Sequence, residues 1–479
     1  MQLKRHPPKA DTTNMADLEF FGAAGTVTGS SHVLRVDDET FLLDCGLFQG
    51  RRAETIARNN HFPVHPDKLS GVLLSHAHID HSGNIPQLVK KRFRGPVYAT
   101  PATCDLCRVM LPDSAHIQEE DARFWNEKRA KRPSDRIEPL YSVADAHAVE
   151  PLLKPVAYQE PIAFADGATV EFLDAGHILG SACMLIQIKR SKPVTLLYTG
   201  DLGRFNMPIL RDPANPLPPV DYLITESTYA DRRHANPLDM KQQLAAIINQ
   251  TRAAGGKVII PSFSVGRTQH VVYFLAMAMA EGLLEPLPIY VDSPLSVHTT
   301  EVFQKHPECY DREAMAFWKS SGDIFGRQLV HYITDVNDSK ALNGKTEPCV
   351  IIASSGMCEA GRILHHLKNN IEDERNTVVI VGFQAQHTLG RRIVERREEI
   401  PIYGRMYKLL CRVEVLNGFS AHADSAEFHK LLSPLAPHLK AAFVVHGEGP
   451  QPIAMKHMLE AAGTKTVHIP NPGDGFRLR

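Results

Sequence analysis

The chain has 479 residues, of which 43% are hydrophobic and 22% are charged. This composition excludes wholesale disorder, and the length predicts two or three domains with ample core. The net charge of -1 provides no global basic field that would attract nucleic acid or an anionic membrane. A polyanionic substrate would therefore have to be held by a local site.

The ends and the cysteines of the chain indicate no export or membrane insertion. The most apolar run, residues 271–280, has about half the length of a membrane span. The first 14 residues are polar and precede no apolar stretch, so they are not a secretory signal. Among the 8 cysteines, Cys104 and Cys107 form a lone C-x-x-C, which is weak evidence for a site. We expect reduced thiols in a cytoplasmic protein.

Short β-rich runs in the first part of the chain end abruptly in polar residues. The fold begins near Phe20, and apolar runs follow at 39–43, 71–75, 194–199, 222–225 and 442–445. The residues that come directly after these runs, or one glycine later, are Asp44, His76, Asp201, Glu226 and His446. Sheet proteins place functional side chains just beyond strand ends, on loops held by a rigid scaffold.

The middle of the chain alternates between strand and helix patterns. Predicted strands at 257–261, 288–291, 348–353 and 377–382 alternate with predicted helices at 237–254, 264–284 and 389–397. This alternation predicts a doubly wound, mostly parallel sheet. We therefore expect an α/β unit inserted into another fold: an extension at 1–14, a first part at 15–227, the inserted domain at 228–398 and a second part at 399–479.

The strongest chemical signal is the sequence His76-x-His78-x-Asp80-His81. In extended backbone His76 and His78 point to the same side, so both can hold one cation. A tight turn after them can bring Asp80 and His81 to a second cation nearby. A solvated polar loop is the plain alternative, and it is disfavoured because distant partners are also present.

Those partners are His177, Asp201 and His446. Each lies at a strand end or in a glycine-containing turn, where a single histidine or aspartate is often only a turn or cap residue. Together with the cluster, they favour a metal site. A carboxylate can bridge two metals, and Asp201 is the natural candidate.

These motifs, in this chain order, resemble the metallo-β-lactamase fold, a four-layer αββα sandwich with a dinuclear site at one edge. The resemblance implies that one metal is held by His76, His78, His177 and Asp201. It implies that the other is held by Asp80, His81, Asp201 and His446. Asp44 would support the site by orienting a ligand imidazole. Imidazole and carboxylate ligands without thiolate suit two divalent cations, Zn²⁺ first, with Mn²⁺ or iron as the other options.

Three further stretches resemble the β-CASP branch of this fold, which processes nucleic acids. They are 225–229 around Glu226, 419–424 around His422, and 444–448 around His446. A histidine in the third stretch is typical of the RNA-processing members. The resemblance runs from about residue 18 to the end and is close to the bacterial and archaeal β-CASP ribonucleases, and to the eukaryotic pre-mRNA 3′-end endonuclease subunit. Two departures from the family pattern are Ala230 and the pair Gln386-His387.

The inserted domain offers three glycine-containing loops, each between a strand and a helix. Helix N-termini present unpaired N–H groups and a positive dipole, so such loops can hold successive phosphates of a single RNA strand. Arginines can add bidentate contacts. The expected substrate-binding residues are Ser264, Arg267, Ser354, Ser355, Arg362, Thr388 and Arg391. For any one loop, an ordinary turn is the competing interpretation.

The resulting hypothesis is metal-dependent hydrolysis of phosphodiester bonds in single-stranded RNA. Two metals about 3.5–4 Å apart would share a hydroxide that attacks phosphorus in line. His422 is the expected general acid, and Glu226 would fix its tautomer and raise its pKa. Asp80 and Asp44 complete the expected catalytic set. As the resemblance implies, products would carry a 5′-phosphate and a 3′-hydroxyl.

Two other classes of function stay open. The first is a small-molecule hydrolase of the same fold, which would not need so large an inserted domain. The second is a non-catalytic RNA-binding scaffold, against which the complete ligand set argues. The sequence decides neither between internal and terminal cleavage nor on RNA preference, and it leaves homo-oligomer formation open.

Overall fold

The computed structural model describes residues 16–50, 52–128, 132, 136–235, 239–326, 329–382, 384 and 388–479. The expected extension at 1–14 and the pair Gln386-His387 lie outside the described residues.

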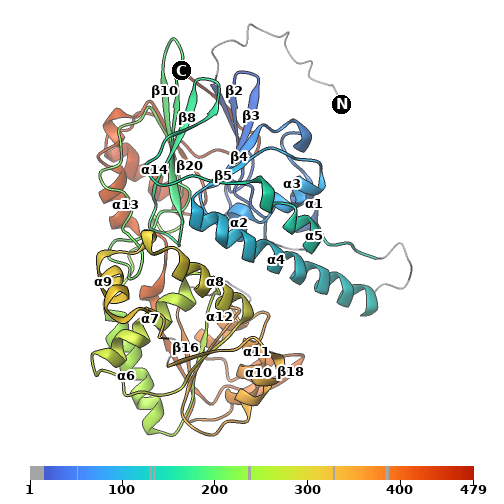
Figure 1. The fold of residues 1–479 in the computed structure, drawn as a ribbon, viewed down its shortest axis with the longest axis vertical. Coiled ribbons are helices and arrows are strands. Elements are labelled where there is room, and N and C mark those ends of the chain that lie inside the picture. Colours follow the sequence, from blue (N-terminus) through green and yellow to red (C-terminus); the bar gives the residue numbers. More distant parts are fainter. Residues whose placement is uncertain are drawn as a thin grey trace.

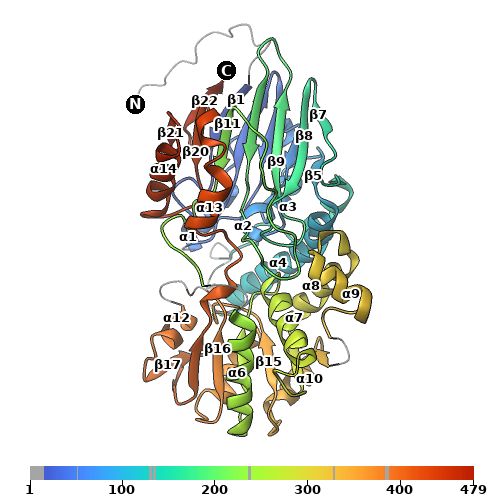
Figure 2. The same ribbon diagram turned by 90° about the vertical axis from the view of Figure 1, so that its left-hand side faces the viewer.

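Two seven-stranded sheets form the upper part of the molecule in Figures 1 and 2. Sheet A has the order β22-β1-β2-β3-β4-β5-β6, with bounds Gly475–Leu478, Ala16–Phe20, His32–Val36, Glu39–Leu43, Gly71–Leu73, Val97–Ala99 and Leu153–Pro155. Sheet B has the order β21-β20-β11-β10-β9-β8-β7, with bounds Val467–His468, Ala441–Val444, Tyr222–Thr225, Val194–Tyr198, Ala182–Ile188, Ala168–Asp174 and Ile162–Ala165.

The two sheets pack face to face because their strands alternate in burial. In β1 every second residue is buried, and Leu18 and Phe20 join a core that also takes Phe172 of β8 and Met184 of β9. Successive side chains of a strand point to opposite faces, so one face of each sheet is left for helices.

Helices cover both outer faces of the pair of sheets (Figures 1 and 2). On the side of sheet A lie α1 (Arg52–Asn60), α2 (Ile79–Ser82), α3 (Ile85–Lys90), α4 (Pro101–Lys128) and α5 (Val143–His147). On the side of sheet B lie α13 (Ser425–Leu432) and α14 (Gln451–Ala461), whose Phe428 and Leu459 pack in one cluster with Leu223 of β11. The predicted αββα arrangement is confirmed.

The lower part, here called the cap, contains a six-stranded sheet in the order β14-β13-β15-β12-β16-β19, and all its pairs are parallel. The strands span Val330–Tyr332, Ile289–Asp292, Val350–Ala353, Val258–Pro261, Thr377–Ile380 and Arg412–Val415. A hairpin of β17 (Glu399–Ile402) and β18 (Arg405–Lys408) lies beside it.

The central cap strands are buried along their whole length, as expected for a parallel sheet covered on both faces. Leu244 of α6 and Leu275 of α7 share a cluster with Ile260 of β12, whereas Leu367 of α11 shares another with Ile259. The cap helices are α6 (Asp239–Ala253), α7 (Arg267–Ala280), α8 (Pro294–Lys305), α9 (Arg312–Ser321), α10 (Val336–Asn343), α11 (Ile363–Asn370) and α12 (Leu389–Val394). The predicted doubly wound insertion is confirmed.

Two element ends differ from the sequence-based expectation for local reasons. The helix expected from residue 264 begins at Arg267, because Gly266 has a φ of 76°, which no α-helix contains. The strand expected to reach Ser75 ends at Leu73, because the Ser75 amide donates to the Asp44 carboxylate. At the far end of the cap, β19 pairs with β16. We therefore propose to move the boundary from residue 399 to about residue 416.

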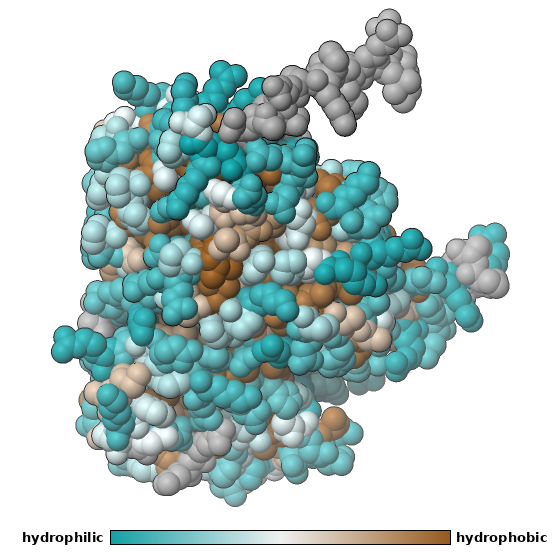
Figure 3. Space-filling model, turned by 45° about the horizontal axis from the view of Figure 1, so that its top comes forward, coloured by the Kyte–Doolittle hydropathy of each residue, from teal (hydrophilic) through white to brown (hydrophobic). Residues whose placement is uncertain are grey.

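The cap is joined to the upper part by a continuous apolar cluster that includes Met110 of α4 and Phe303 of α8. Such packing fixes the position of the cap over the strand ends of sheets A and B. In Figure 3 the visible face is largely hydrophilic, with apolar side chains in smaller patches. Among the described residues, no helix is both long and apolar enough to span a membrane.

Candidate metal centre

The expected metal ligands come from loops that follow strands of both sheets. Asp44 follows β3, and the segment from His76 to His81 follows β4 in sheet A. Asp201 follows β10 and His446 follows β20 in sheet B. His177 lies in the turn between β8 and β9. Parallel strands of a sheet end at the same edge, so residues far apart in the sequence meet at this one edge.

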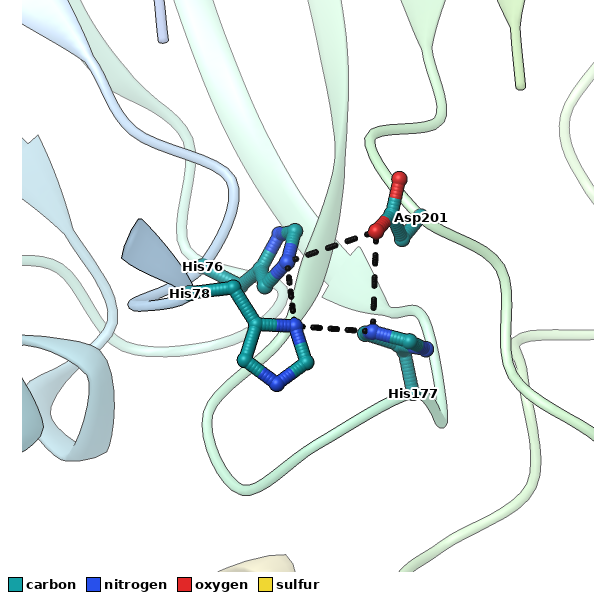
Figure 4. Close-up of side chains that lie close together, drawn as sticks. All are labelled: His76, His78, His177 and Asp201. Atoms are coloured by element: carbon teal, nitrogen blue, oxygen red, sulfur yellow. Dashed lines mark hydrogen bonds and ion pairs between the residues drawn. The ribbon is translucent and has the colours of Figure 1, made fainter. Parts of the chain in front are cut away.

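The first cluster contains His76, His78, His177 and Asp201 (Figure 4). His78 Nδ1 lies 3.2 Å from His76 Nε2 and 3.1 Å from His177 Nε2. Asp201 Oδ2 lies 3.6 Å from both of those Nε2 atoms. The four ligand atoms therefore point toward one common centre.

The second cluster contains Asp80, His81 and His446. His81 Nε2 and His446 Nε2 are 3.3 Å apart, and Asp80 Oδ2 lies 3.5 Å from His446 Nε2. Asp201 reaches this cluster with its other oxygen, because Oδ1 is 3.3 Å from His81 Nε2. That oxygen is buried and accepts no hydrogen bond from the described residues. Asp201 thus faces both clusters, one oxygen each.

These spacings fit divalent cations. A tetrahedral Zn²⁺ with ligands at about 2.0–2.1 Å keeps neighbouring ligand atoms about 3.3 Å apart. The separations in the first cluster run from 3.1 to 3.6 Å. Without a cation, three imidazole nitrogens facing one another would leave lone pairs or protons opposed. The residues present fit two metal ions, and the donor set of imidazole and carboxylate does not by itself select the metal.

The ionisation of the first cluster also suits metal binding. Burial lowers the pKa values of His76 and His177 well below the usual value, and it lowers the pKa of His78 to about 4. The three imidazoles are therefore neutral at pH 7, and only neutral imidazole has a lone pair for a cation.

The second cluster behaves differently because carboxylates surround it. Burial by itself would lower the pKa values of His81 and His446, but the surrounding carboxylates, Asp201 foremost, together outweigh it and raise both pKa values. Burial opposes ionisation of Asp80, yet the hydrogen bond with His446 and the charges of the neighbouring imidazoles together keep the pKa of Asp80 below the usual value. Bound cations would replace the protons on these imidazoles, so metal binding here releases protons.

Asp44 is the buried anchor of the second cluster. Its Oδ2 accepts from His81 Nδ1 at 2.7 Å and from the Tyr198 hydroxyl at 2.6 Å. Its Oδ1 accepts from the Ser75 amide at 2.7 Å. These contacts leave Nε2 of His81 as the nitrogen that faces the cluster. Asp44 has a φ of 60°, an uncommon conformation for a residue with a side chain, and such residues often lie at functional sites.

Replacement of Asp44 by asparagine is expected to weaken metal binding about 10–100-fold, because the orientation of His81 is lost. Metal content after dialysis against graded chelator measures the change. The matched control is Asp174→Asn, at a half-buried carboxylate on the end of β8 that pairs with Arg211. Equal metal retention by both variants would refute the role of Asp44.

His422 and Glu226 meet beside the first cluster. His422 Nδ1 lies 3.2 Å from both carboxylate oxygens of Glu226 and 3.9 Å from Asp201 Oδ2. Burial alone would lower the pKa of His422, but the charge and hydrogen bond of Glu226 raise it to about 9. Glu226 is fixed in turn by the amide of Leu202, which donates to Oε1 at 2.6 Å. His422 therefore keeps its proton at neutral pH, with Nε2 as the nitrogen that Glu226 does not hold.

Three supporting residues were missed by the sequence interpretation. Ser75 contacts His76 Nδ1 at 3.0 Å, and Thr228 contacts His446 Nδ1 at 3.1 Å. Tyr198 donates to Asp44. Ser75 precedes a ligand directly, which is a usable signal. Thr228 lies in the stretch 225–229 that resembles the β-CASP branch, which is also a usable signal. Tyr198 carries no pattern that separates it from ordinary strand residues, because its role depends on tertiary contacts.

The expected substrate-binding residues gather at one edge of the cap sheet. They follow β12, β15 and β16, which are neighbours in that sheet. Gly266 in the first loop lies next to Ile178, since a Cβ added there would be 3.6 Å from the Ile178 side chain. This edge therefore faces the loop that carries His177.

Several of those side chains already make hydrogen bonds within the protein. The Ser354 and Ser264 hydroxyls both lie within 3.2 Å of the Ser293 hydroxyl. The Ser355 hydroxyl accepts a hydrogen bond from the Glu359 amide at 3.2 Å. The Thr388 hydroxyl accepts one from the Arg391 amide at 3.1 Å. Arg267 donates to the Val381 carbonyl.

The Arg362 guanidinium makes several hydrogen bonds within the cap. It donates to Asp292 Oδ1 at 2.6 Å, to the Thr334 carbonyl at 2.6 Å and to the Ile333 carbonyl at 3.2 Å. Asp292 is fully buried and also contacts His366 Nε2 at 2.6 Å. We propose that Arg362 supports the cap loop instead of contacting substrate directly.

Arg362→Ala is then expected to destabilise the cap by about 2–4 kcal/mol, because it removes one partner of a buried ion pair. Arg391→Ala should change stability by less than about 0.5 kcal/mol, because the Arg391 side chain is 42% exposed and pairs with Glu395 on the same helix. Thermal unfolding followed by circular dichroism compares the two. Unchanged unfolding of the Arg362 variant would return this arginine to the candidate RNA contacts.

Comparisons with known proteins agree with this geometry. The metallo-beta-lactamase superfamily model matches residues 24–238, the Beta-Casp domain model 268–393, and the model of a Zn-dependent metallo-hydrolase RNA specificity domain 406–470. The chain belongs to the β-CASP family of the metallo-β-lactamase superfamily, and it has the fold of a metallo-hydrolase.

Particular relatives cover the chain almost completely. A protein of Thermus thermophilus named ribonuclease TTHA0252 is 35% identical over 95% of this chain and 98% of its own length. Transcription termination factor FttA of Methanosarcina mazei is 30% identical over 89% of this chain, which spans only 66% of that protein. A crystal structure of a protein of unknown function from Enterococcus faecalis V583 superimposes with a TM-score of 0.56 at 12% identity, over 97% of this chain and all of the other, which supports the fold alone.

Proposed function

We propose that this protein is a metal-dependent ribonuclease that hydrolyses single-stranded RNA. The observation that carries the proposal is the pair of ligand clusters that share Asp201, beside the imidazole of His422 paired with Glu226. A hydrolase that cleaves phosphodiesters needs charge neutralisation on the phosphate and a proton for the leaving oxygen, and these groups supply both.

Two divalent cations, when bound, would activate water and neutralise charge on the phosphate. The residues that would hold them are His76, His78, His177 and Asp201 on one side, and Asp80, His81, His446 and Asp201 on the other. Zn²⁺ is our first choice for both ions, with Mn²⁺ second.

The side chains of the protein would donate the proton, orient the catalytic groups and contact the RNA. His422 holds a proton at Nε2 and gives it to the departing ribose 3′-oxygen, which leaves a 3′-hydroxyl and a 5′-phosphate. Glu226 keeps the imidazole charged before transfer and fixed in direction. Asp44 and Asp80 support the second cluster. Ser264, Arg267, Ser354, Ser355, Thr388 and Arg391 remain the candidate contacts to the RNA backbone, at the cap edge that faces His177.

The relatives favour RNA as the substrate, since a protein that matches over 98% of its own length is named ribonuclease and the third domain model is named for RNA specificity. The loops after β12, β15 and β16, which are neighbours in the cap sheet, can hold successive phosphates of one strand, which favours single-stranded RNA. We place the protein in the cytoplasm, because all 8 cysteines are free and buried.

Digestion of end-labelled RNA, with free and with blocked 5′ ends, tests the proposal. The chain stripped of metal should be inactive, and addition of Zn²⁺ or Mn²⁺ should restore cleavage to 5′-phosphorylated products. The product ladder separates internal from terminal cleavage. Hydrolysis of a chromogenic lactam without RNA cleavage would favour a small-molecule hydrolase. RNA binding without cleavage by the fully loaded protein would favour a scaffold.

A further inference from the structure

The chain crosses between the upper part and the cap twice. It leaves sheet B after β11 and enters the cap at α6, and it returns from β19 to α13. Ala235 lies in the first connection, and Gly418 lies in the second. The second connection also carries His422, just before α13 begins. His422 is therefore in a connecting loop, so the position of its imidazole depends on what holds that loop.

The guanidinium of Arg204 contacts both connections. Arg204 follows β10 and is 4% exposed. Its Nη1 donates to the Gly418 carbonyl and its Nη2 to the Ala235 carbonyl, each at 2.9 Å. Its Nε lies 3.4 Å from Oε2 of Glu427, a mostly buried carboxylate in the first turn of α13. One side chain thus contacts residues that precede and follow His422 in the sequence.

The residues just before Arg204 pair with the backbone at His422. Gly203 and His422 form an antiparallel bridge, and the Ala423 amide donates to the Leu202 carbonyl at 2.7 Å. So short a pair is weak by itself, because even an isolated two-stranded hairpin is only marginally stable in water. The contacts of the guanidinium add the constraint that this short pair lacks.

The set of acceptors around residue 204 requires arginine. A guanidinium is planar and has five N–H donors, so it can hold two carbonyls and a carboxylate at the same time. Lysine carries the same charge, but its three donors share one nitrogen, which cannot reach acceptors on three separate segments. The Gly418 carbonyl is buried, and a buried acceptor that loses its donor is unfavourable. Loss of the guanidinium should therefore shift or loosen the second connection.

We propose that Arg204 is a positioning residue for proton transfer, because it holds the two connections of the cap together and so fixes the loop that carries His422. This role rests on the proposed function, in which His422 donates the proton to the leaving oxygen. The three groups that the guanidinium contacts belong to neither ligand cluster. Loss of Arg204 should thus leave the metals in place and slow only the step that needs the proton.

Arg204→Lys tests the proposal, since it keeps the positive charge beside Glu427 and removes the planar fork. The variant should keep the metal content of the unaltered protein and lower kcat about 10–100-fold on ordinary RNA, with KM changed by less than about threefold. On RNA with sulfur in place of the bridging 3′-oxygen, the leaving group needs no proton. The rate of the variant on that substrate should come within about threefold of the rate of the unaltered protein.

The matched control is Arg190→Lys. Arg190 is also mostly buried, donates to the Asp37 carboxylate and donates to the Asp166 carbonyl at 3.1 Å. It precedes β10, whereas Arg204 follows that strand, so the two arginines lie at opposite ends of β10. The control should cleave both substrates at the rate of the unaltered protein.

Two further variants separate positioning from a general loss of structure. Arg204→Lys added to His422→Ala should lower the rate no further, because the effect of Arg204 acts through His422. Glu427→Gln loosens the same contact from α13 and should give the same difference between the oxygen and sulfur substrates, with a smaller effect. It therefore tests the proposal if Arg204→Lys folds poorly.

Hydrogen–deuterium exchange on the metal-free protein follows the loop without any activity measurement. In Arg204→Lys the peptide that covers residues 417–424 should exchange about tenfold faster than in the unaltered protein. The peptide that covers residues 76–81 should exchange at the same rate in both proteins, as should both peptides in Arg190→Lys.

Any of five results would overturn the proposal: a full rate of Arg204→Lys on ordinary RNA, equal slowing on both substrates, loss of metal, further slowing in the double variant, or unchanged exchange at residues 417–424. Failure of the loaded, unaltered protein to cleave any RNA would count against the proposed function instead. The exchange experiment then still decides whether Arg204 holds the loop.

Discussion

Asp201→Ala is expected to lower kcat/KM by at least about 10³-fold and to reduce bound metal from two ions per chain to less than one. Asp201 is the residue that both clusters share. Its Oδ2 lies 3.6 Å from His76 and His177, and its Oδ1 lies 3.3 Å from His81. Without it, each cluster loses a charged ligand at once. Inductively coupled plasma mass spectrometry on dialysed protein measures the metal, and cleavage of RNA measures the rate.

A structural collapse has to be separated from this chemical effect. The control is Asp311→Asn, at the carboxylate that caps α9 and belongs to neither cluster. It should retain both metals and the full rate, and both variants should have the same circular dichroism spectrum. Two tightly held ions and near-normal cleavage in Asp201→Ala would contradict the shared-ligand assignment.

His422→Ala is expected to keep both metals and to lower turnover by about 10²–10⁴-fold, the range for loss of a general acid. The pKa of about 9 for His422 means that the imidazole carries the proton it has to donate at neutral pH. The decisive comparison uses RNA with sulfur in place of the bridging 3′-oxygen. A thiolate leaves without a proton, so on that substrate the variant should recover most of its rate.

The matched control for this histidine is His468→Ala, which removes an imidazole stacked on Phe443 outside the clusters. It should cleave both substrates like the unaltered protein. If His422→Ala were equally slow on the oxygen and the sulfur substrate, the proton would come from elsewhere and His422 would only position the RNA.

The metal ligands could be predicted from the sequence because their residue types and spacing are typical of metal sites. Four potential ligands occur within the six residues 76–81, and each distant partner follows an apolar run. The structure brings these residues together, with Asp201 in contact with both groups. Their assignment to particular ions is still a prediction, which the Asp44 and Asp201 variants test.

The fold class of the cap could be predicted from the sequence, but its side-chain contacts could not. The alternation of strand and helix patterns in the middle of the chain predicts a parallel sheet. The sequence cannot tell that Arg362 is held by Asp292, because the two are 70 residues apart and only the fold makes them meet.

The last strands of the chain complete the first. β22 pairs with β1, and His446 becomes available only after the cap has been made. A polypeptide that is still being synthesised therefore lacks His446, one ligand of the second cluster, and the edge strand β22 of sheet A until nearly its end. The second ligand cluster is therefore completed only after the cap has been synthesised, so metal binding at that cluster follows the folding of nearly the whole chain.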